Sequence, residues 1–352
     1  MPPAVETAAA PPPRPAAVAP VRRTVPPVVP PGATPRPPYD LVSAVTALGR
    51  GFDGKAGIAV RDIQAGWVIS FNGNAAFPQQ SVSKLWVALT FMDAVDRGVL
   101  SLDDPILVRR ADLAVFHAPI RQFVTGDGYR TTLRRLLEGA MTQSDNACND
   151  MLLRKVGGPD AIRAFLARKG LSGISFGPGE GKLQARIAGL DWKPEWAGTQ
   201  GFLEARSKLS YEVRAAALQR YLDDPYDGAS PEGITHALAQ LRQGQLLTPS
   251  STALLTSLMA ASRTGPQRMR AGLGPDWALA HKTGTGQELG SLATGYNDVG
   301  ILTAPDGRTY AVAVMIANTR QSIPVRQRLM ADVVRAVVRS APATRSGTSL
   351  AQ

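Results

Sequence analysis

The stretch SVSKLWVALTFM, residues 81–92, decides the fold of this chain and contains its most informative motif, Ser81-Val82-Ser83-Lys84. After the motif, apolar residues recur at helical spacing, which predicts a helix. Ser81 lies in the first turn of that predicted helix, and Lys84 follows one turn later on the same face. We therefore expect a lysine amine within reach of a serine hydroxyl. The apolar residues concerned are Leu85, Trp86, Leu89 and Met92.

Two further motifs follow in order, Ser144-Asp145-Asn146 and Lys282-Thr283-Gly284. A serine three residues before a lysine is common by chance, so the order and the flanks of the three motifs carry the argument. The flanks are Phe77-Pro78 before the serine, Gly157-Gly158-Pro159 after the second motif, and residues 271–286 around the third. The ordered set S-x-x-K, S-D-N and K-T-G is a known signature of serine acyl transfer.

With these motifs and flanks, residues 39–340 resemble the penicillin-recognising serine hydrolases, and most of all the class A β-lactamases. The resemblance implies an α/β (α+β) fold, in which N- and C-terminal helices flank an antiparallel sheet. An all-helical second lobe, at about residues 81–245, is inserted between the sheet segments. The three motifs are then expected to meet at the seam between the lobes.

The residue patterns agree with that architecture. Residues 57–60 and 68–71 read as a hairpin of two short strands. Strands are expected again at 278–281 and 299–303, and the alternation of apolar residues from 312 to 316 predicts another. A final helix is indicated by apolar residues spaced by four. These are Leu329, Val333 and Val337.

The resemblance assigns the chemistry residue by residue. Ser81 becomes the nucleophile, activated by the positive end of its helix and by Lys84. Ser144 relays a proton to the departing nitrogen. The backbone amides of Ser81 and Thr285 form the oxyanion hole.

Substrate-binding positions follow from the same resemblance. Asn146 is expected to hold the acyl side-chain amide, and Lys282 with Thr283, Gly284 and Thr285 to form the strand edge that attracts the substrate carboxylate. Phe116 is either an aromatic gate over the site or a core side chain. The rival serine mechanism needs a histidine base. Only His117, His236 and His281 are available for it, and His281 should point away from the face that Lys282 occupies.

The deacylating base is where the resemblance fails. Class A enzymes carry a glutamate in an E-x-x-L-N pattern, which does not occur here, and residues 181–230 look rebuilt. Counting back from Asp227, in the loop-closing Asp224-x-x-Asp227, places Arg214 at the glutamate position. Glu212 is the nearest acid, although it also fits the first turn of a surface helix. The other candidates are Glu195 and Glu204.

Three functions follow from these observations. The first is a class A-like β-lactamase that hydrolyses β-lactams through an acyl-enzyme on Ser81. A penicillin-binding D-Ala-D-Ala peptidase with slow deacylation is the second, because no E-x-x-L-N is present. A noncatalytic envelope-binding protein with a vestigial site is the third.

Composition sets the remaining expectations. The 352 residues contain 44% hydrophobic residues, enough for a full core, and no apolar run of 18 residues that would span a membrane. Residues 1–38, rich in proline, and 341–352 are expected to be disordered tails. The net charge of +11 is spread without a basic block, so no nucleic-acid partner is indicated.

The expected partner is therefore a small β-lactam or a peptidoglycan stem peptide, bound by a monomer. The family resemblance implies a periplasmic or extracellular location, although no signal peptide is visible at the N-terminus. Cys148 is the only cysteine and is expected to be a buried thiol. The three histidines show no metal-ligand spacing, so no cofactor is expected.

Overall fold

A computed structural model describes residues 36–341, and its centre is a six-stranded sheet. Along the sheet the strand order is β2-β1-β10-β9-β7, and β8 pairs with β9. All of these pairings are antiparallel. The strands are β1 (Lys55–Asp62), β2 (Val68–Phe71), β7 (Ala278–Gly284), β8 (Glu288–Leu289), β9 (Leu292–Thr303) and β10 (Thr309–Thr319).

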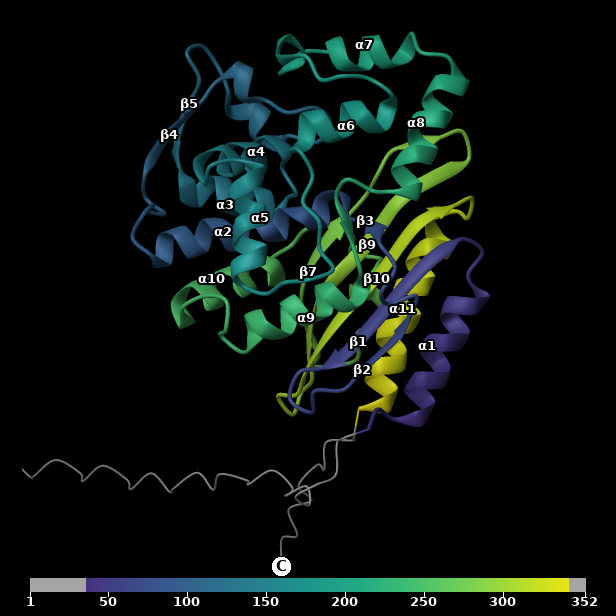
Figure 1. Ribbon diagram of the computed structural model, residues 1–352. Coiled ribbons are helices and arrows are strands. Elements are labelled where there is room, and N and C mark those ends of the chain that lie inside the picture. The colour runs from purple at the N-terminus through teal and green to yellow at the C-terminus, as the bar shows by residue number, and fades with distance from the viewer. Residues whose placement is uncertain (1–35, 342–352) are drawn as a thin grey trace, which may run out of the picture. The chain divides into compact units, whose positions relative to one another are not determined.

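Helices α1 (Tyr39–Gly51) and α11 (Ile323–Ser340) cover one face of the sheet (Figure 1). Because side chains alternate along a strand, β10 contributes to two different cores. Val312, Val314 and Ile316 join the core beneath α1 and α11. Ala311, Ala313 and Met315 join the core on the opposite side.

The opposite face carries α9 (Pro231–Arg242), which contacts β10, β1 and β9. The small Ala311 and Ala313 side chains leave room for this close approach. Beyond α9 lies the helical lobe, which spreads over the left and the top of Figure 1. Its helices are α2 (Lys84–Asp96), α3 (Leu133–Thr142), α4 (Asn146–Lys155), α5 (Pro159–Arg168), α6 (Glu180–Ala188), α7 (Gly201–Ser207), α8 (Tyr211–Asp223) and α10 (Pro249–Ala260).

Helix α2 runs through the middle of this lobe, which is why its apolar pattern is so dense. Trp86 and Phe91 are fully buried, and only its last turn reaches solvent. A 3-10 turn, η1 (Gln80–Ser83), precedes it and carries Ser81. The lobe also contains two short ladders, β4 (Pro105–Val108) with β5 (Tyr129–Thr132), and β3 (Phe77–Pro78) with β6 (Gly228–Ala229).

The antiparallel sheet between terminal helices, with a helical lobe inserted, is confirmed. The expected 57–60 and 68–71 hairpin is present as β1 and β2, and the final helix is α11. Strands β8 and β9 pair in a short hairpin, Glu288 with Ala293 and Leu289 with Leu292. The tails expected at 1–38 and 341–352 lie almost wholly outside the described residues. No helix within residues 36–341 has the length and apolarity needed to cross a bilayer.

Candidate active site

A cavity of about 480 Å³ lies where η1, the turn before α4, α6, α7 and the end of β7 meet. It brings together residues from all three sequence motifs. Polar and charged side chains dominate its lining. The lining residues are Ser81, Phe116, His117, Ser144, Asn146, Glu180, Gln184, Arg206, Thr264, Arg268, Thr283, Thr285, Gly286, Gln287 and Glu288.

Ser81 and Lys84 stand one turn apart, as their spacing predicts. Lys84 Nζ donates a hydrogen bond to Ser81 Oγ at 2.8 Å and another to Asn146 Oδ1 at 2.9 Å. The Lys84 side chain is only 1% exposed, so both bonds form away from bulk water. Gln80, directly before the serine, has a φ of 53°, a left-handed conformation that costs a non-glycine residue of the order of 1 kcal/mol.

A second lysine–serine pair faces the first. Lys282 Nζ donates to Ser144 Oγ at 2.8 Å and to the Thr283 carbonyl at 2.9 Å. Burial lowers the pKa of Lys282 well below its usual range, and the cations Lys84 and Arg268 lower it further. The two pairs place two lysine amines and two serine hydroxyls around one cavity.

The glycine of the third motif lets strand β7 approach the nucleophile turn. A Cβ at Gly284 would collide with the Gln79 carbonyl oxygen, so only glycine fits there. Asn297 on β9 fastens the same turn, because its Nδ2 donates to the Pro78 and Gln79 carbonyls at 2.8 and 3.0 Å. These contacts with the backbone of the nucleophile turn determine where Ser81 lies relative to Lys282.

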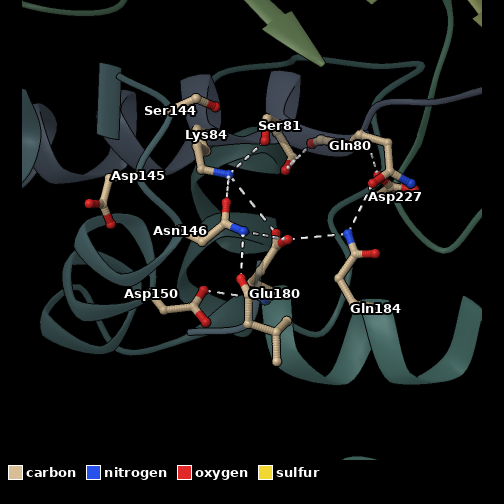
Figure 2. A network of polar contacts seen from close by, with 12 residues as sticks. Gln80, Ser81, Lys84, Ser144, Asp145, Asn146, Asp150, Glu180, Gln184 and Asp227 are labelled. Atoms are coloured by element: carbon tan, nitrogen blue, oxygen red, sulfur yellow. Dashed lines mark hydrogen bonds and ion pairs between the residues drawn. The ribbon is translucent and has the colours of Figure 1, made fainter. Parts of the chain in front are cut away.

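Asn146 connects the serine–lysine pair to a glutamate (Figure 2). Its Nδ2 donates to the Val115 carbonyl and to Glu180 Oε1, both at 3.0 Å. Glu180 Oε2 also lies 3.9 Å from Lys84 Nζ. Ser81, Lys84, Asn146 and Glu180 therefore form one continuous network of polar contacts.

Glu180 sits at the first turn of α6 and is the site residue that sequence reasoning missed. A signal was present: Glu180, Leu183 and Gln184 read E-x-x-L-Q, which is the E-x-x-L-N spacing with glutamine in place of asparagine. Gln184 Nε2 donates to Glu180 Oε1 at 3.2 Å and to Gln80 Oε1 at 3.0 Å. The glutamine side chain is longer than that of asparagine and still contacts the Glu180 carboxylate.

The structure corrects the expectation for Glu212. This residue is exposed in the first turn of α8, where the Ser210 hydroxyl contributes to a lowered pKa, and it does not line the cavity. Glu195 and Glu204 are likewise exposed and outside the cavity. Counting back from Asp227 failed because α7 and α8 are inserted between Glu180 and Asp227.

Two further carboxyls lie near the site, the half-buried Asp150 and the buried Asp227. Asp150 Oδ1 accepts from the Glu180 backbone N–H at 3.3 Å, and burial together with the Glu180 charge raises the pKa of Asp150 to about 6. Asp227 accepts from the Gln80 N–H at 2.7 Å and from the Tyr221 hydroxyl at 2.8 Å. Burial raises the pKa of Asp227 to about 6 as well.

The structure also gives the positions of the remaining motif residue Asp145, of the cysteine and of two histidines. Asp145 caps α4, accepting from Cys148 N at 3.0 Å and from Ile120 N at 2.6 Å, so its role is structural. Cys148 is buried, as expected. His281 points away from the cavity and hydrogen bonds Asp298 at 2.7 Å. His117 lines the cavity and is hydrogen-bonded to the Gln143 carbonyl.

Arg268 is a further cation at the third motif that the sequence pattern did not single out. Its guanidinium donates to the Gly284 and Asn297 carbonyls at 2.9 and 2.6 Å, and to Thr285 Oγ1 at 2.6 Å. It also stacks over Tyr296, 3.8 Å from the ring centroid. Phe116, 41% exposed, lies at the mouth of the cavity rather than in the core.

Within residues 36–341, no group of three or more His, Cys, Asp or Glu side chains could hold a metal ion. The chemistry the arrangement offers is that of a serine hydroxyl with lysine, glutamate and serine partners for proton transfer. Both the fold and the site are of the class found in serine acyl-transfer enzymes.

Comparison with known proteins supports this class. The model described as "Beta-lactamase enzyme family" matches residues 40–341. "Extended-spectrum beta-lactamase PER-1" of Pseudomonas aeruginosa is 29% identical over 258 residues, 73% of this chain and 73% of that protein. The crystal structure of a beta-lactamase from Chitinophaga pinensis DSM 2588 has a TM-score of 0.71 and 27% identity, covering 86% of this chain and 100% of that one.

An "Ancestral (GNCA) Beta-lactamase class A" structure is 29% identical with a TM-score of 0.67, covering 85% of this chain and 99% of that one. This chain belongs to the beta-lactamase enzyme family. The resemblance to class A enzymes noted from the sequence is thereby confirmed.

Proposed function

We propose that this protein hydrolyses β-lactams in two steps, through an acyl-enzyme on Ser81, with Glu180 as the deacylating base. One observation carries the proposal: the same buried lysine, Lys84, contacts the serine hydroxyl at 2.8 Å and lies 3.9 Å from the Glu180 carboxylate. Nucleophile and base thus share one polar network in one cavity.

In the first step, Ser81 Oγ attacks the lactam carbonyl carbon, and the carbonyl oxygen is held by the backbone amides of Ser81 and Thr285. The serine proton passes to Lys84 Nζ, which is hydrogen-bonded to Ser81 Oγ at 2.8 Å. When the ring C–N bond breaks, Ser144, hydrogen-bonded to Lys282 at 2.8 Å, delivers a proton to the leaving nitrogen, and the proton taken up by Lys84 restores the Ser144 hydroxyl. The Arg268 guanidinium attracts the substrate carboxylate, and the Lys282 amine beside it is a further hydrogen-bond donor.

In the second step, Glu180 accepts a proton from a water molecule that attacks the ester carbonyl. The C–O bond to Ser81 breaks, and Oγ regains a proton. Asn146 and Gln184, which both donate to Glu180 Oε1, hold the carboxylate in place for this step. A fixed base is needed because water is a poor nucleophile toward an ester.

Slow deacylation was the main argument for a D-Ala-D-Ala peptidase, and it depended on the absence of a glutamate. Glu180 in the cavity removes that argument. The complete set of polar contacts around Ser81 likewise leaves no observation in favour of a noncatalytic protein.

The test is intact-mass spectrometry of the purified protein at intervals after mixing with benzylpenicillin, with the absorbance of the free drug followed in parallel. We expect a transient adduct and consumption of many equivalents of drug. A stable adduct with a single equivalent consumed would overturn the hydrolytic proposal and favour the peptidase.

We further propose that the enzyme acts as a monomer outside the cytoplasm, as the class A resemblance implies. Sedimentation velocity of the purified protein tests the first point. Fractionation of the native host, followed by β-lactam hydrolysis assays of each fraction, tests the second.

A further inference from the structure

Helix α7 brings a cation into the cavity from the segment between α6 and α8. Arg206, near the end of this helix, lines the cavity. Its guanidinium carbon lies 5.4 Å from the Phe116 ring centroid and 5.7 Å from that of Phe202. Arg206 Nη1 also donates to Gln287 Oε1 at 2.8 Å. Two aromatic rings and one amide therefore hold the guanidinium at the cavity wall.

No carboxylate balances this charge. None of the ion pairs formed within residues 36–341 includes Arg206, and its Nε and Nη2 donate to no side chain or carbonyl there. The two carboxylates that line the cavity have other partners. Glu180 contacts Lys84 and Asn146, and Glu288 contacts Arg326 at 2.9 Å.

Partial burial and a second cation both act against the charge of Arg206. Partial burial lowers the pKa of the guanidinium, and the nearby Arg214 lowers it further. A bound anion would relieve both effects. Guanidinium groups with free N–H donors bind carboxylates in a bidentate manner, which makes Arg206 suited to such a ligand.

The position of Arg206 indicates which part of a substrate it would meet. Its partner Gln287 donates to the side chain and the carbonyl of Gln184, at 2.9 and 3.0 Å, and Gln184 contacts Glu180. Arg206 thus adjoins the Glu180 and Asn146 side of the cavity. Lys282, Thr285 and Arg268 form the cationic group at the third motif. With the ring carboxylate assigned to the third motif, we place the acyl side chain on the Arg206 side of the cavity.

We propose that Arg206, Phe116 and Gln287 form an anion subsite that favours β-lactams with a carboxylate on the acyl side chain. The inference rests on the proposed function, since it assumes that β-lactams are acylated at Ser81. Phe116 provides the apolar wall for the side chain, and the free N–H groups of Arg206 provide the donors.

The test uses two penicillins that differ by one group. Carbenicillin is benzylpenicillin with a carboxylate on the carbon next to the phenyl ring. The variants are Arg206→Gln, which keeps a donor for Gln287 but removes the charge, and Arg206→Lys, which keeps the charge. Lys208→Gln, at the exposed end of α7, is the control for loss of one positive charge.

We expect Arg206→Gln to lower the ratio of kcat/KM for carbenicillin to kcat/KM for benzylpenicillin by about tenfold, because one charge-assisted hydrogen bond contributes about 1.5 kcal/mol or more. Arg206→Lys should keep most of the ratio, and Lys208→Gln should leave it unchanged. The rate of Ser81 adduct formation, measured by mass spectrometry, should change in the same proportions.

Equal losses on both penicillins in Arg206→Gln would overturn the subsite, because they would mean that the arginine only fastens α7 to the β8 hairpin. Unchanged kcat/KM values for both penicillins would overturn it too. Failure of the underlying function looks different, since the wild-type protein would then turn over neither penicillin. Adduct-formation rates would still report the subsite in that case.

Discussion

The two carboxylate oxygens of Glu180 have different neighbours, and these neighbours suit the residue to act as a base. Asn146 and Gln184 both donate to Oε1, while Oε2 lies toward Lys84. An acid with this many fixed donors keeps one orientation, which general-base catalysis requires. Glu212, fully exposed at a helix start, has no comparable neighbours in the cavity.

Glu180→Gln should therefore separate the two chemical steps. We expect acylation of Ser81 to continue and the acyl-enzyme to accumulate, with kcat for benzylpenicillin falling at least about 100-fold, because general-base catalysis contributes about that much. Intact-mass spectrometry during turnover measures the adduct. The matched control is Glu212→Gln, which should turn over like the wild type. Normal turnover by Glu180→Gln would remove this residue as the base.

Ser81→Ala should abolish the adduct altogether, since no other hydroxyl in the cavity is paired with Lys84. Ser83→Ala is the control. Its hydroxyl donates to the Gln80 carbonyl and does not line the cavity, so labelling should persist. Mass mapping of the penicillin adduct checks both, and an adduct on Ser81→Ala would place the nucleophile elsewhere.

Asp227 should make stability depend on pH. Its folded-state pKa of about 6 exceeds the unfolded value of about 3.9, so between these values the folded protein binds more protons. The contribution of Asp227 is therefore present at low pH and is lost as the pH rises through 6. Relative to Asp227→Asn, the wild type should lose roughly 2 kcal/mol between pH 4.5 and 7.5. Urea unfolding at both values tests this, and a constant difference would contradict it.

At the scale of elements, the segment from α6 to α8 is held by its own aromatic cluster. Trp196 contacts Trp192 at 5.8 Å and Phe202 at 6.0 Å between ring centroids. Phe202 in turn meets Phe116 edge to face at 5.6 Å. This satellite core, separate from the two large ones, positions α7 and hence Arg206.

Trp196→Ala should loosen this segment without unfolding the protein. Deleting a buried tryptophan removes about 3 to 5 kcal/mol of packing, and a satellite cluster absorbs that loss locally. Hydrogen exchange followed by mass spectrometry should accelerate in residues 190–210 and stay unchanged in β9 and β10. Tyr211→Ala, at a 59% exposed side chain, should leave both regions unchanged. Faster exchange throughout the sheet would show that the cluster is not independent.

At the scale of the whole molecule, the sheet separates two cores, and the site is on one side only. Figure 1 shows α1 and α11 on the face opposite the helical lobe. Leu41 of α1 is fully buried in the core on that face, whereas the cavity is lined by the helical lobe and by the end of β7 with the segment that follows it. Stability and chemistry can therefore be altered separately.

Leu41→Ala should cost about 2 to 5 kcal/mol of stability, through lost apolar contacts and the remaining void. Its kcat, measured well below the unfolding transition, should match the wild type. Ser43→Ala, exposed on the same helix, should change stability by about 0.5 kcal/mol or less. Urea denaturation and steady-state kinetics measure the two effects. A proportional loss of kcat would show that the two sides of the sheet are coupled.

The sequence by itself determined the class of fold and the residues of the three motifs. Helical spacing placed Lys84 one turn from Ser81, strand alternation separated His281 from Lys282, and apolar period predicted β10 and α11. These are local regularities, in which near neighbours decide the geometry. They remain valid wherever the element is placed.

Only the tertiary structure brought Glu180 and the cation of α7, Arg206, to the cavity. Glu180 is 96 residues from Lys84 (180 − 84 = 96), and the contact at 3.9 Å depends on how α6 meets α2 and α4. Counting along the chain placed Arg214 there, with Glu212 as the nearest acid, because the two helices α7 and α8 lengthen the sequence between Glu180 and Asp227. Long-range contacts of this kind depend on packing, which no local pattern encodes.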